Sequence, residues 1–202
     1  TRVKNPEKYG VVLTNEEGRI QDFVEKPPVF VGDRINAGIY IFRKEVLDRI
    51  ELKRTSIERE VFPKMAEEGK LFALDLQGYW MDVGQPKDYL NGMTLYMDAV
   101  KPKNTYQPTN SNVTILEGVD IHPSVQIGSG SVIGPYVSIG ENTVIGEGVS
   151  IKQSSIMSGV SIGDHTLVKN TIVGWDSSVG KWCRLQNNTI LGESVSDSDG
   201  CF

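Results

Sequence analysis

A repeat of six residues runs through the last third of the chain and constrains its fold more than any other feature. Apolar residues recur at this spacing in two series: Ile121, Ile127, Ile133, Ile139, Ile145, Ile151 and Met157, then Ile162, Val168, Val173, Val179, Leu185 and Leu191. A small or β-branched residue follows each of them four positions later, and glycine often comes directly after. A period this short predicts a solenoid, because one coil cannot bury its own apolar face and neighbouring coils must stack.

Three such units would close one triangular coil of a left-handed parallel β-helix, which we expect over residues 116–202. The spacing shortens by one residue twice, between Met157 and Ile162 and between Val168 and Val173. We expect tightened corners at these two places. Cys183 occupies one of the small inward positions, which predicts a packing role for its thiol. Solenoids of this kind serve as catalytic domains and as passive platforms, so the repeat alone leaves function open.

Composition excludes several classes of function. The net charge of −5 argues against a nucleic-acid partner, which would require a basic surface. A run of about 18 apolar residues and a charged-then-apolar leader are both missing, which predicts neither a membrane span nor a secretory signal. The two cysteines fit a reducing compartment, so we expect a cytoplasmic protein. Neither cysteine forms a spaced ligand set with His122 or His165, so a zinc site has no support.

The first hundred residues follow a different pattern, in which strands and helices alternate. We expect a hairpin of strands 9–14 and 19–24, a buried strand over 35–42, helices over 44–50 and 55–68, strands over 71–76 and 79–83, and a helix from Pro86. A capping box at Thr55-Ser56-Ile57-Glu58 opens the second helix, and Gly69 ends it. This alternation predicts an α/β layer structure over residues 1–100.

A polar stretch rich in Pro and Asn, residues 101–115, separates the two patterns and is expected to be a linker. The chain opens at Thr1-Arg2-Val3 and enters strand-like sequence almost at once. We therefore expect it to begin inside a domain.

Three clusters in the α/β part could carry chemistry. Glu25 and Lys26 leave a strand just before Pro27-Pro28, where an ammonium could hold phosphate and a carboxylate could accept hydroxyl hydrogens. Asn36 opens the next strand beside small residues that would let a ligand approach. Asp82 lies in an apolar strand end and is a candidate metal ligand. Taken singly, each has a structural alternative: an exposed ion pair, a tight packing contact and a turn aspartate.

Taken together, these motifs resemble one family. They are Tyr9-Gly10-Val11, Phe23-Val24-Glu25-Lys26-Pro27, Ile35-Asn36-Ala37-Gly38-Ile39-Tyr40, Thr55-Ser56-Ile57-Glu58 and Trp80-Met81-Asp82-Val83-Gly84-Gln85-Pro86, with Ile172-Val173-Gly174-Trp175 and Thr189-Ile190-Leu191-Gly192-Glu193 in the repeat. They are similar to those of the sugar-phosphate nucleotidyltransferases, in particular the mannose-1-phosphate guanylyltransferases. The resemblance covers nearly the whole chain. It implies the C-terminal half of a Rossmann-like nucleotidyltransferase domain followed by the β-helix.

The resemblance also implies a reaction, in which mannose 1-phosphate attacks the α-phosphate of GTP and pyrophosphate leaves. Lys26 would be the catalytic contact to the sugar phosphate, Glu25 would bind the sugar hydroxyls, and Gly10 and Asn36 would bind the sugar. Asp82 would hold Mg²⁺. The family further implies assembly through the β-helix, as a homo-oligomer or with a regulatory paralogue.

Two features depart from the family. The glycine-rich nucleotide loop and a second metal-binding aspartate belong to an N-terminal half that these residues do not contain, and the sequence after Glu193 diverges. We therefore expect that the 202 residues alone do not make GDP-mannose. We also expect an incomplete last coil that weakens assembly.

Two other functions stay open. A non-catalytic regulatory or assembly subunit of the same family would share the fold, although the presence of Lys26 and Asp82 favours the enzyme. A hexapeptide-repeat acyltransferase would need a histidine base facing a cleft between coils. His122 and His165 both fall at predicted turns, which favours surface positions instead.

Overall fold

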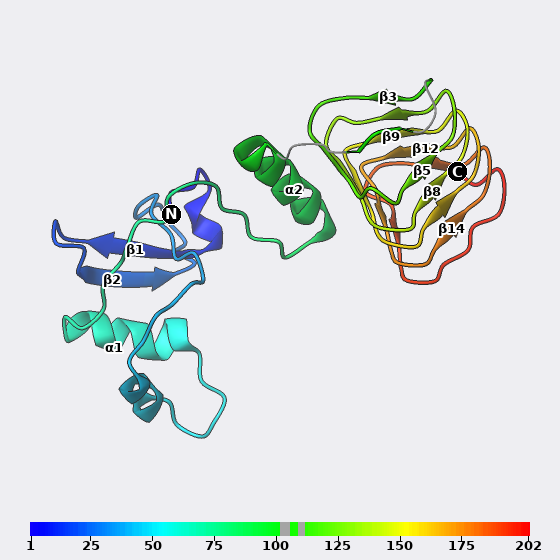
Figure 1. Ribbon diagram of the computed structural model, residues 1–202. Helices are drawn as coiled ribbons and strands as arrows, with labels where there is room; N and C mark the ends of the chain where they lie inside the picture. The colour runs from blue at the N-terminus through cyan, green and yellow to red at the C-terminus, as the bar shows by residue number, and fades with distance from the viewer. Residues whose placement is uncertain (102–105, 109–111) are drawn as a thin grey trace. The chain divides into compact units, whose positions relative to one another are not determined.

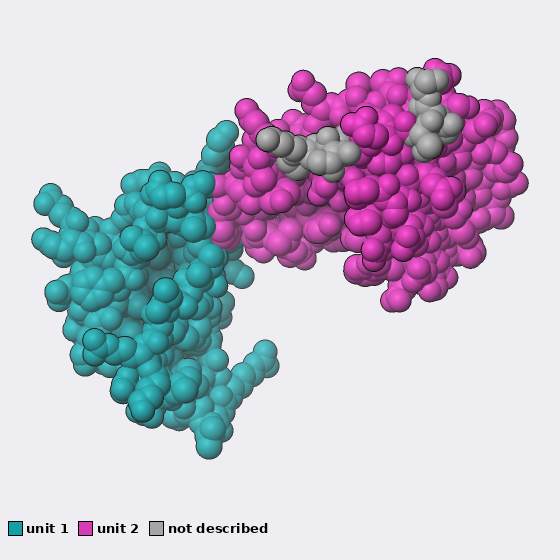
Figure 2. Space-filling view, viewed as in Figure 1, with its two compact units in different colours: residues 1–78 teal, residues 79–202 magenta. Residues whose placement is uncertain are grey.

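The computed structural model describes residues 1–101, 106–108 and 112–202. Its contacts divide the chain into two compact units, Thr1–Gly78 and Tyr79–Phe202 (Figure 2). This division falls earlier than the predicted linker, and part of that linker, residues 102–105 and 109–111, lies outside the described residues. The predicted domain boundaries therefore stay a prediction. None of the helices in the described part of the chain is long and apolar enough to cross a membrane.

A two-stranded hairpin forms the centre of the first unit (Figure 1). It follows the short 3-10 helix η1 (Pro6–Lys8) and pairs β1 (Gly10–Thr14) with β2 (Ile20–Glu25) in antiparallel register, as the sequence predicts. Gly18 closes the turn at a φ of 77°, which suits a residue without a side chain. Phe23 of β2 is buried and meets the ring of Phe62 edge-on at 5.2 Å between centroids.

The helical segment that covers the hairpin begins with one π-turn, η3 (Ile57–Val61), and continues as α1 (Phe62–Glu67). The cap is Ser56, whose hydroxyl accepts the backbone N–H of Arg59 at 3.3 Å, while Glu60 accepts the N–H of Ser56 at 2.9 Å. The predicted helix is confirmed in position, but its cap is Ser56 and not Thr55, and the carboxylate that accepts the N–H of the cap belongs to Glu60 and not to Glu58. The earlier predicted helix is a 3-10 helix, η2 (Lys44–Arg49).

The strands predicted over 35–42, 71–76 and 79–83 are wrong. Arg34, Ile35 and Phe72 take part in isolated β-bridges, and no strand forms over residues 35–42, 71–76 and 79–83, all of which the structure describes. Ile41 is 98% exposed and Leu74 is 96% exposed. An apolar, β-prone sequence becomes a strand only where a neighbouring backbone is available to pair with it.

An ion pair joins the end of α1 to the end of η2. Both guanidinium nitrogens Nη1 and Nη2 of Arg49 donate to the carboxylate of Glu68, at 2.8 and 2.7 Å, and Lys70 Nζ lies 2.9 Å from it. The Arg49 hydrogen bonds, followed by that of Lys70, hold the pKa of Glu68 at about 2, below its ordinary 4.5. Because the folded pKa is depressed, this stabilisation is present above pH 4.5 and is lost as the pH falls towards 2.

We expect the substitution Arg49→Met to raise the pKa of Glu68. The side-chain carboxyl signal of Glu68, followed by NMR across this pH range, would measure the change. Lys53→Met removes a cation that pairs with Glu51 instead and serves as the control. Equal pKa values of Glu68 in both variants would contradict the pairing.

The second unit contains a parallel β-solenoid, which confirms the fold class predicted from the six-residue repeat. Short strands stack into three parallel sheets: β16-β13-β10-β7-β4, β14-β11-β8-β5 and β15-β12-β9-β6-β3. In chain order the strands are β3 (Thr114–Ile115), β4 (Val119–Ile121), β5 (Gln126–Ile127), β6 (Val132–Ile133), β7 (Val137–Ile139), β8 (Val144–Ile145), β9 (Ser150–Lys152), β10 (Ser154–Ile156), β11 (Ser161–Ile162), β12 (Leu167–Lys169), β13 (Ile172–Val173), β14 (Ser178–Val179), β15 (Arg184–Leu185) and β16 (Ile190–Leu191).

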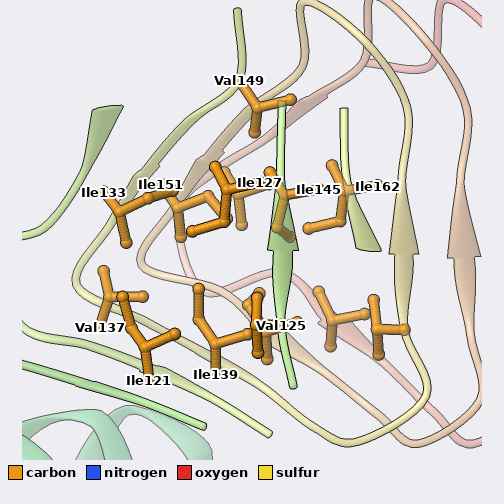
Figure 3. Packing of buried hydrophobic residues seen from close by; sticks show 14 of the residues in the cluster. Ile121, Val125, Ile127, Ile133, Val137, Ile139, Ile145, Val149, Ile151 and Ile162 are labelled. Atoms are coloured by element: carbon orange, nitrogen blue, oxygen red, sulfur yellow. The ribbon is translucent and has the colours of Figure 1, made fainter. Parts of the chain in front are cut away.

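The side chains of the repeat point into the solenoid and form one continuous core (Figure 3). Cys183 is fully buried there as a free thiol, as predicted. The inward residue of β10 is Ile156 and not Met157, so the first shortened step lies between Ile151 and Ile156. Gln153 takes a left-handed φ of 47° at this corner, as does Asn170 at the second shortened step, with a φ of 49°.

Helix α2 (Pro86–Val100) belongs to the same unit as the solenoid. It begins with proline at its first turn, as predicted, and ends where Lys101 adopts a φ of 46°. The Tyr89 hydroxyl lies 3.3 Å from the Ser155 hydroxyl, and the Tyr136 hydroxyl donates to Asp98 at 3.0 Å. These two hydrogen bonds connect the helix to the coils.

Candidate functional site

The end of the β1–β2 hairpin brings four of the predicted site residues together. Gly10 and Glu25 are direct partners across the two strands. The backbone N–H of Asn36 donates to the carbonyl of Gly10 at 2.8 Å, so Asn36 lies beside the same pair. Lys26 follows Glu25, and its backbone N–H donates to the carbonyl of Tyr9 at 3.0 Å. The hairpin register and two backbone hydrogen bonds therefore define one small cluster.

The space beside Gly10 is narrow because the carboxylate of Glu25 and the ring of Phe23 occupy it. A Cβ atom on Gly10 would lie 2.7 Å from Glu25 Oε2 and 2.9 Å from the ring of Phe23. Lys26 adopts a left-handed φ of 49° and its side chain is exposed, while Pro27 after it is buried. The cluster thus combines a half-buried carboxylate, an exposed ammonium and an amide, a set that suits a ligand with hydroxyl and phosphate groups.

A cavity of about 1270 Å³ lies in the first unit, and of the predicted site residues only Asn36 lines it. Its other lining residues are mostly apolar and include Ile39, Ile41 and Leu74 from the segments that were predicted as strands. Gly10, Glu25 and Lys26 do not line this cavity, so its volume does not describe the cluster that they form with Asn36.

Asp82, the predicted metal ligand, lies in the second unit and is exposed. Its segment packs on α2, since a Cβ atom on Gly92 would lie 3.6 Å from both Met81 and Val83. Across the described ranges 1–101, 106–108 and 112–202, no group of three His, Cys, Asp or Glu side chains could hold a metal ion. Mg²⁺ is commonly bound by one or two carboxylates together with substrate phosphates, so Asp82 alone does not make a protein site for it.

Tyr40 and Glu58, to which the sequence assigned no role, lie beside the cluster. Asn36 Nδ2 donates to the Tyr40 hydroxyl at 2.5 Å, and the Tyr40 hydroxyl donates to Glu58 Oε1 at 3.4 Å. Burial raises the pKa of Tyr40, and the carboxylates of Glu58 and Glu25 raise it further against the opposing hydrogen bond from Asn36. Both residues were part of motifs quoted from the sequence, but nothing in their spacing indicated that they meet.

The geometry of the two histidines does not favour an acyltransferase base. His122 is exposed, and its Nδ1 lies 2.8 Å from the hydroxyl of Ser124 in its own turn. The ring of His165 packs on Trp182 at 4.2 Å between centroids and occupies a left-handed corner with a φ of 59°. Both are turn residues, as predicted.

Comparison with known proteins gives two family matches that together cover most of the chain. Residues 1–99 match the nucleotidyl transferase model, and residues 115–202 match the model described as the GMPPB C-terminal domain. These two ranges agree with the change of sequence pattern near residue 100.

Curated relatives are similar over the whole chain. A mannose-1-phosphate guanyltransferase beta-B from Xenopus laevis is 53% identical over 203 residues, which are 100% of this chain and 56% of the relative. A probable mannose-1-phosphate guanylyltransferase 2 from Oryza sativa subsp. japonica is 50% identical with the same coverage, and a mannose-1-phosphate guanyltransferase from Pichia angusta is 52% identical over 100% of this chain and 57% of its own length. The chain therefore spans a little over half the length of the curated relatives it matches.

Proposed function

The chain belongs to the mannose-1-phosphate guanylyltransferase family, beta type, and on that premise we propose that it supplies the sugar-phosphate side of an enzyme making GDP-mannose and pyrophosphate from GTP and mannose 1-phosphate. One observation carries this proposal. The hairpin register places Glu25 beside Gly10, with Lys26 next in the chain and Asn36 bonded to Gly10. These residues supply the acceptor, cation and amide that a sugar phosphate requires.

In the proposed reaction an oxygen of the sugar phosphate forms a bond to the α-phosphorus of GTP, and the bond to the β-phosphate oxygen breaks as pyrophosphate leaves. The exposed ammonium of Lys26 binds the sugar phosphate and offsets its charge as the two phosphates approach. Glu25 accepts hydrogens from sugar hydroxyls, and Gly10 binds the sugar through its backbone, next to the Glu25 carboxylate that fills the place of a Cβ atom. Asn36 offers both a donor and an acceptor to the sugar.

Mg²⁺ bound with the phosphates would stabilise the negative charge that develops on transfer. Asp82 is the one ligand for it that we propose in this chain. A relative from Xenopus tropicalis is named catalytic subunit beta, and this supports the proposal that the solenoid mediates assembly with a second copy or a paralogue. The cytoplasmic location stays a prediction.

Lys26→Ala is expected to weaken binding of mannose 1-phosphate to this chain by about 10-fold or more, because a hydrogen bond to a charged group contributes about 1.5–3 kcal/mol. NMR titration of the 202-residue chain would measure the affinity. Lys4→Ala, which removes another exposed lysine of the same unit, is the matched control and should bind like the parent chain.

Affinities of Lys26→Ala and Lys4→Ala that do not differ would contradict the role of Lys26. We also propose that these 202 residues do not turn over GTP and mannose 1-phosphate without added polypeptide, since their 21 glycines do not include the family's nucleotide loop. Pyrophosphate release by the isolated chain would overturn that part of the proposal.

A further inference from the structure

Three polar side chains form a hydrogen-bonded row next to the hairpin cluster: Asn36, Tyr40 and Glu58. The first two lie on the segment that follows the hairpin, and Glu58 lies on the π-turn that opens the helix. Asn36 belongs to the proposed sugar site, whereas Tyr40 and Glu58 have no role in it so far. The row therefore connects the proposed site to a helical segment about 20 residues further along the chain.

The orientation of the Asn36 side chain is fixed at both of its polar atoms. The backbone N–H of Gly38 donates to Asn36 Oδ1 at 3.1 Å. A backbone N–H can only donate, so this bond identifies the amide oxygen, and Nδ2 is the atom that meets Tyr40. Gly38 has a φ of 76° and no heavy atom within 4 Å of where its Cβ would lie. One Nδ2 hydrogen and one Oδ1 lone pair of Asn36 remain available to a ligand in this arrangement.

Aromatic packing positions the Tyr40 hydroxyl. The ring of Tyr40 meets Phe62 edge-on at 5.0 Å between centroids and stacks on Phe42 at 5.6 Å. Phe62 is 2% exposed and is part of the core under the hairpin. The place of the hydroxyl is thus set by core packing, and burial raises the pKa of Tyr40.

Glu58 determines which atoms donate and which accept in the hydrogen bonds that join Asn36, Tyr40 and Glu58. An ionised carboxylate can only accept, so the Tyr40 hydrogen is directed to Glu58 Oε1 and the lone pairs of the hydroxyl face Asn36 Nδ2. The other carboxylate oxygen, Oε2, lies 3.4 Å from the hydroxyl of Ser56. Asn36 and Tyr40 therefore each donate one hydrogen bond and accept one, and Glu58 accepts two.

We propose that Tyr40 and Glu58 are positioning residues for sugar recognition: Glu58 orients the Tyr40 hydroxyl, and this hydroxyl holds the amide of Asn36 in the orientation that binds a sugar hydroxyl. The inference rests on the proposed function of the Asn36 cluster. Neither residue needs to contact the ligand. The row should therefore affect recognition of the sugar and leave recognition of the phosphate, assigned to Lys26, unchanged.

The test compares Tyr40→Phe and Glu58→Gln with the parent chain. Phenylalanine keeps the ring packed on Phe62 and Phe42 while removing the hydroxyl. Glutamine keeps the size of Glu58 while allowing it to donate as well as accept. Tyr96→Phe, which removes another partly exposed tyrosine hydroxyl, is the matched control. NMR would follow the side-chain amide signals of Asn36 in the free chain, and titrations would use mannose 1-phosphate and inorganic phosphate.

Tyr40→Phe is expected to shift and broaden the Asn36 amide signals and to weaken binding of mannose 1-phosphate by about 2- to 10-fold, the range for one uncharged hydrogen bond. Glu58→Gln should move the same signals with a smaller loss. Affinity for inorganic phosphate should be unchanged in both variants, which a general loss of structure would not produce. Tyr96→Phe should match the parent in every measurement.

The outcomes separate this inference from the proposed function. If Lys26→Ala weakens binding while Tyr40→Phe binds like Tyr96→Phe, the positioning role is overturned and the sugar-phosphate site stands. Unchanged Asn36 amide signals in Tyr40→Phe would overturn the role without any ligand. A parent chain that does not bind mannose 1-phosphate would overturn both proposals.

Discussion

The substitution Gly174→Ala is expected to lower the free energy of unfolding of the solenoid by about 1–3 kcal/mol, the usual cost of overpacking. Gly174 follows β13, and a Cβ atom there would lie 2.4 Å from the carbonyl oxygen of Gly192 in the next coil. This neighbour is backbone, so it cannot rotate away. Adjacent coils would have to separate at this corner and would lose ladder hydrogen bonds such as the one from Gly174 N to Leu191 O.

Gly192→Ala provides the matched control. Gly192 follows β16 at the equivalent position one coil later, but its Cβ would have only a Val195 methyl nearby, at 3.8 Å. Both substitutions reduce the freedom of the unfolded chain equally, so this effect cancels in the comparison. Gly192→Ala should change the free energy of unfolding by no more than about 0.5 kcal/mol.

Urea unfolding followed by tryptophan fluorescence would measure this difference. Trp80, Trp175 and Trp182 are the three tryptophans of the chain, and all lie in the second unit. The fluorescence signal therefore reports on that unit alone. Equal unfolding midpoints for the two glycine variants would show that the coils do not approach as closely as described here.

Ile151→Ala is expected to lower the free energy of unfolding by about 2–5 kcal/mol, because it leaves a cavity in a close-packed interior. Ile151 is fully buried, and it pairs in register with Ile133 in the coil before and Val168 in the coil after. Its methyl and methylene groups contact the core of both neighbours (Figure 3). Each coil buries its apolar face only against adjacent coils, so the loss should spread along the solenoid.

The same fluorescence measurement tests this prediction, with Ile190→Ala as the control. Ile190 lies on β16 and is 50% exposed, so its truncation should cost less than about 1 kcal/mol. A result within 1 kcal/mol of the parent for Ile151→Ala would mean that the repeat does not pack as one continuous core.

The local sequence pattern was enough to single out candidate ligand-binding residues but not to predict how they are arranged. Glu25 and Lys26 could be singled out because a carboxylate and an ammonium end a strand before two prolines. Their closeness to Asn36 depends on the hydrogen bond from Asn36 N to the Gly10 carbonyl. The meeting of Tyr40 with Glu58, 18 residues away, depends on how the segment of residues 36–42 packs against Phe62. No periodicity records a contact of this kind.

The sequence by itself determined the solenoid. Its six-residue period is local, each coil pairs with the next one 17 or 18 residues further on, and the inward residue of every strand except β10 follows from that spacing. The one wrong prediction in the repeat was small: the inward residue of β10 is Ile156 where the spacing predicted Met157, and the predicted fold is unchanged.

Only the tertiary structure decided the α/β part. The segments 35–42 and 71–76 have the composition of buried strands, yet strand formation depends on a distant backbone that can pair, and these residues form only isolated bridges. Helix α2 likewise became part of the solenoid unit through Tyr89 and Asp98, which contact residues far along the chain. A repeat specifies its own neighbours, whereas a single strand or helix acquires its neighbours only when the whole chain folds.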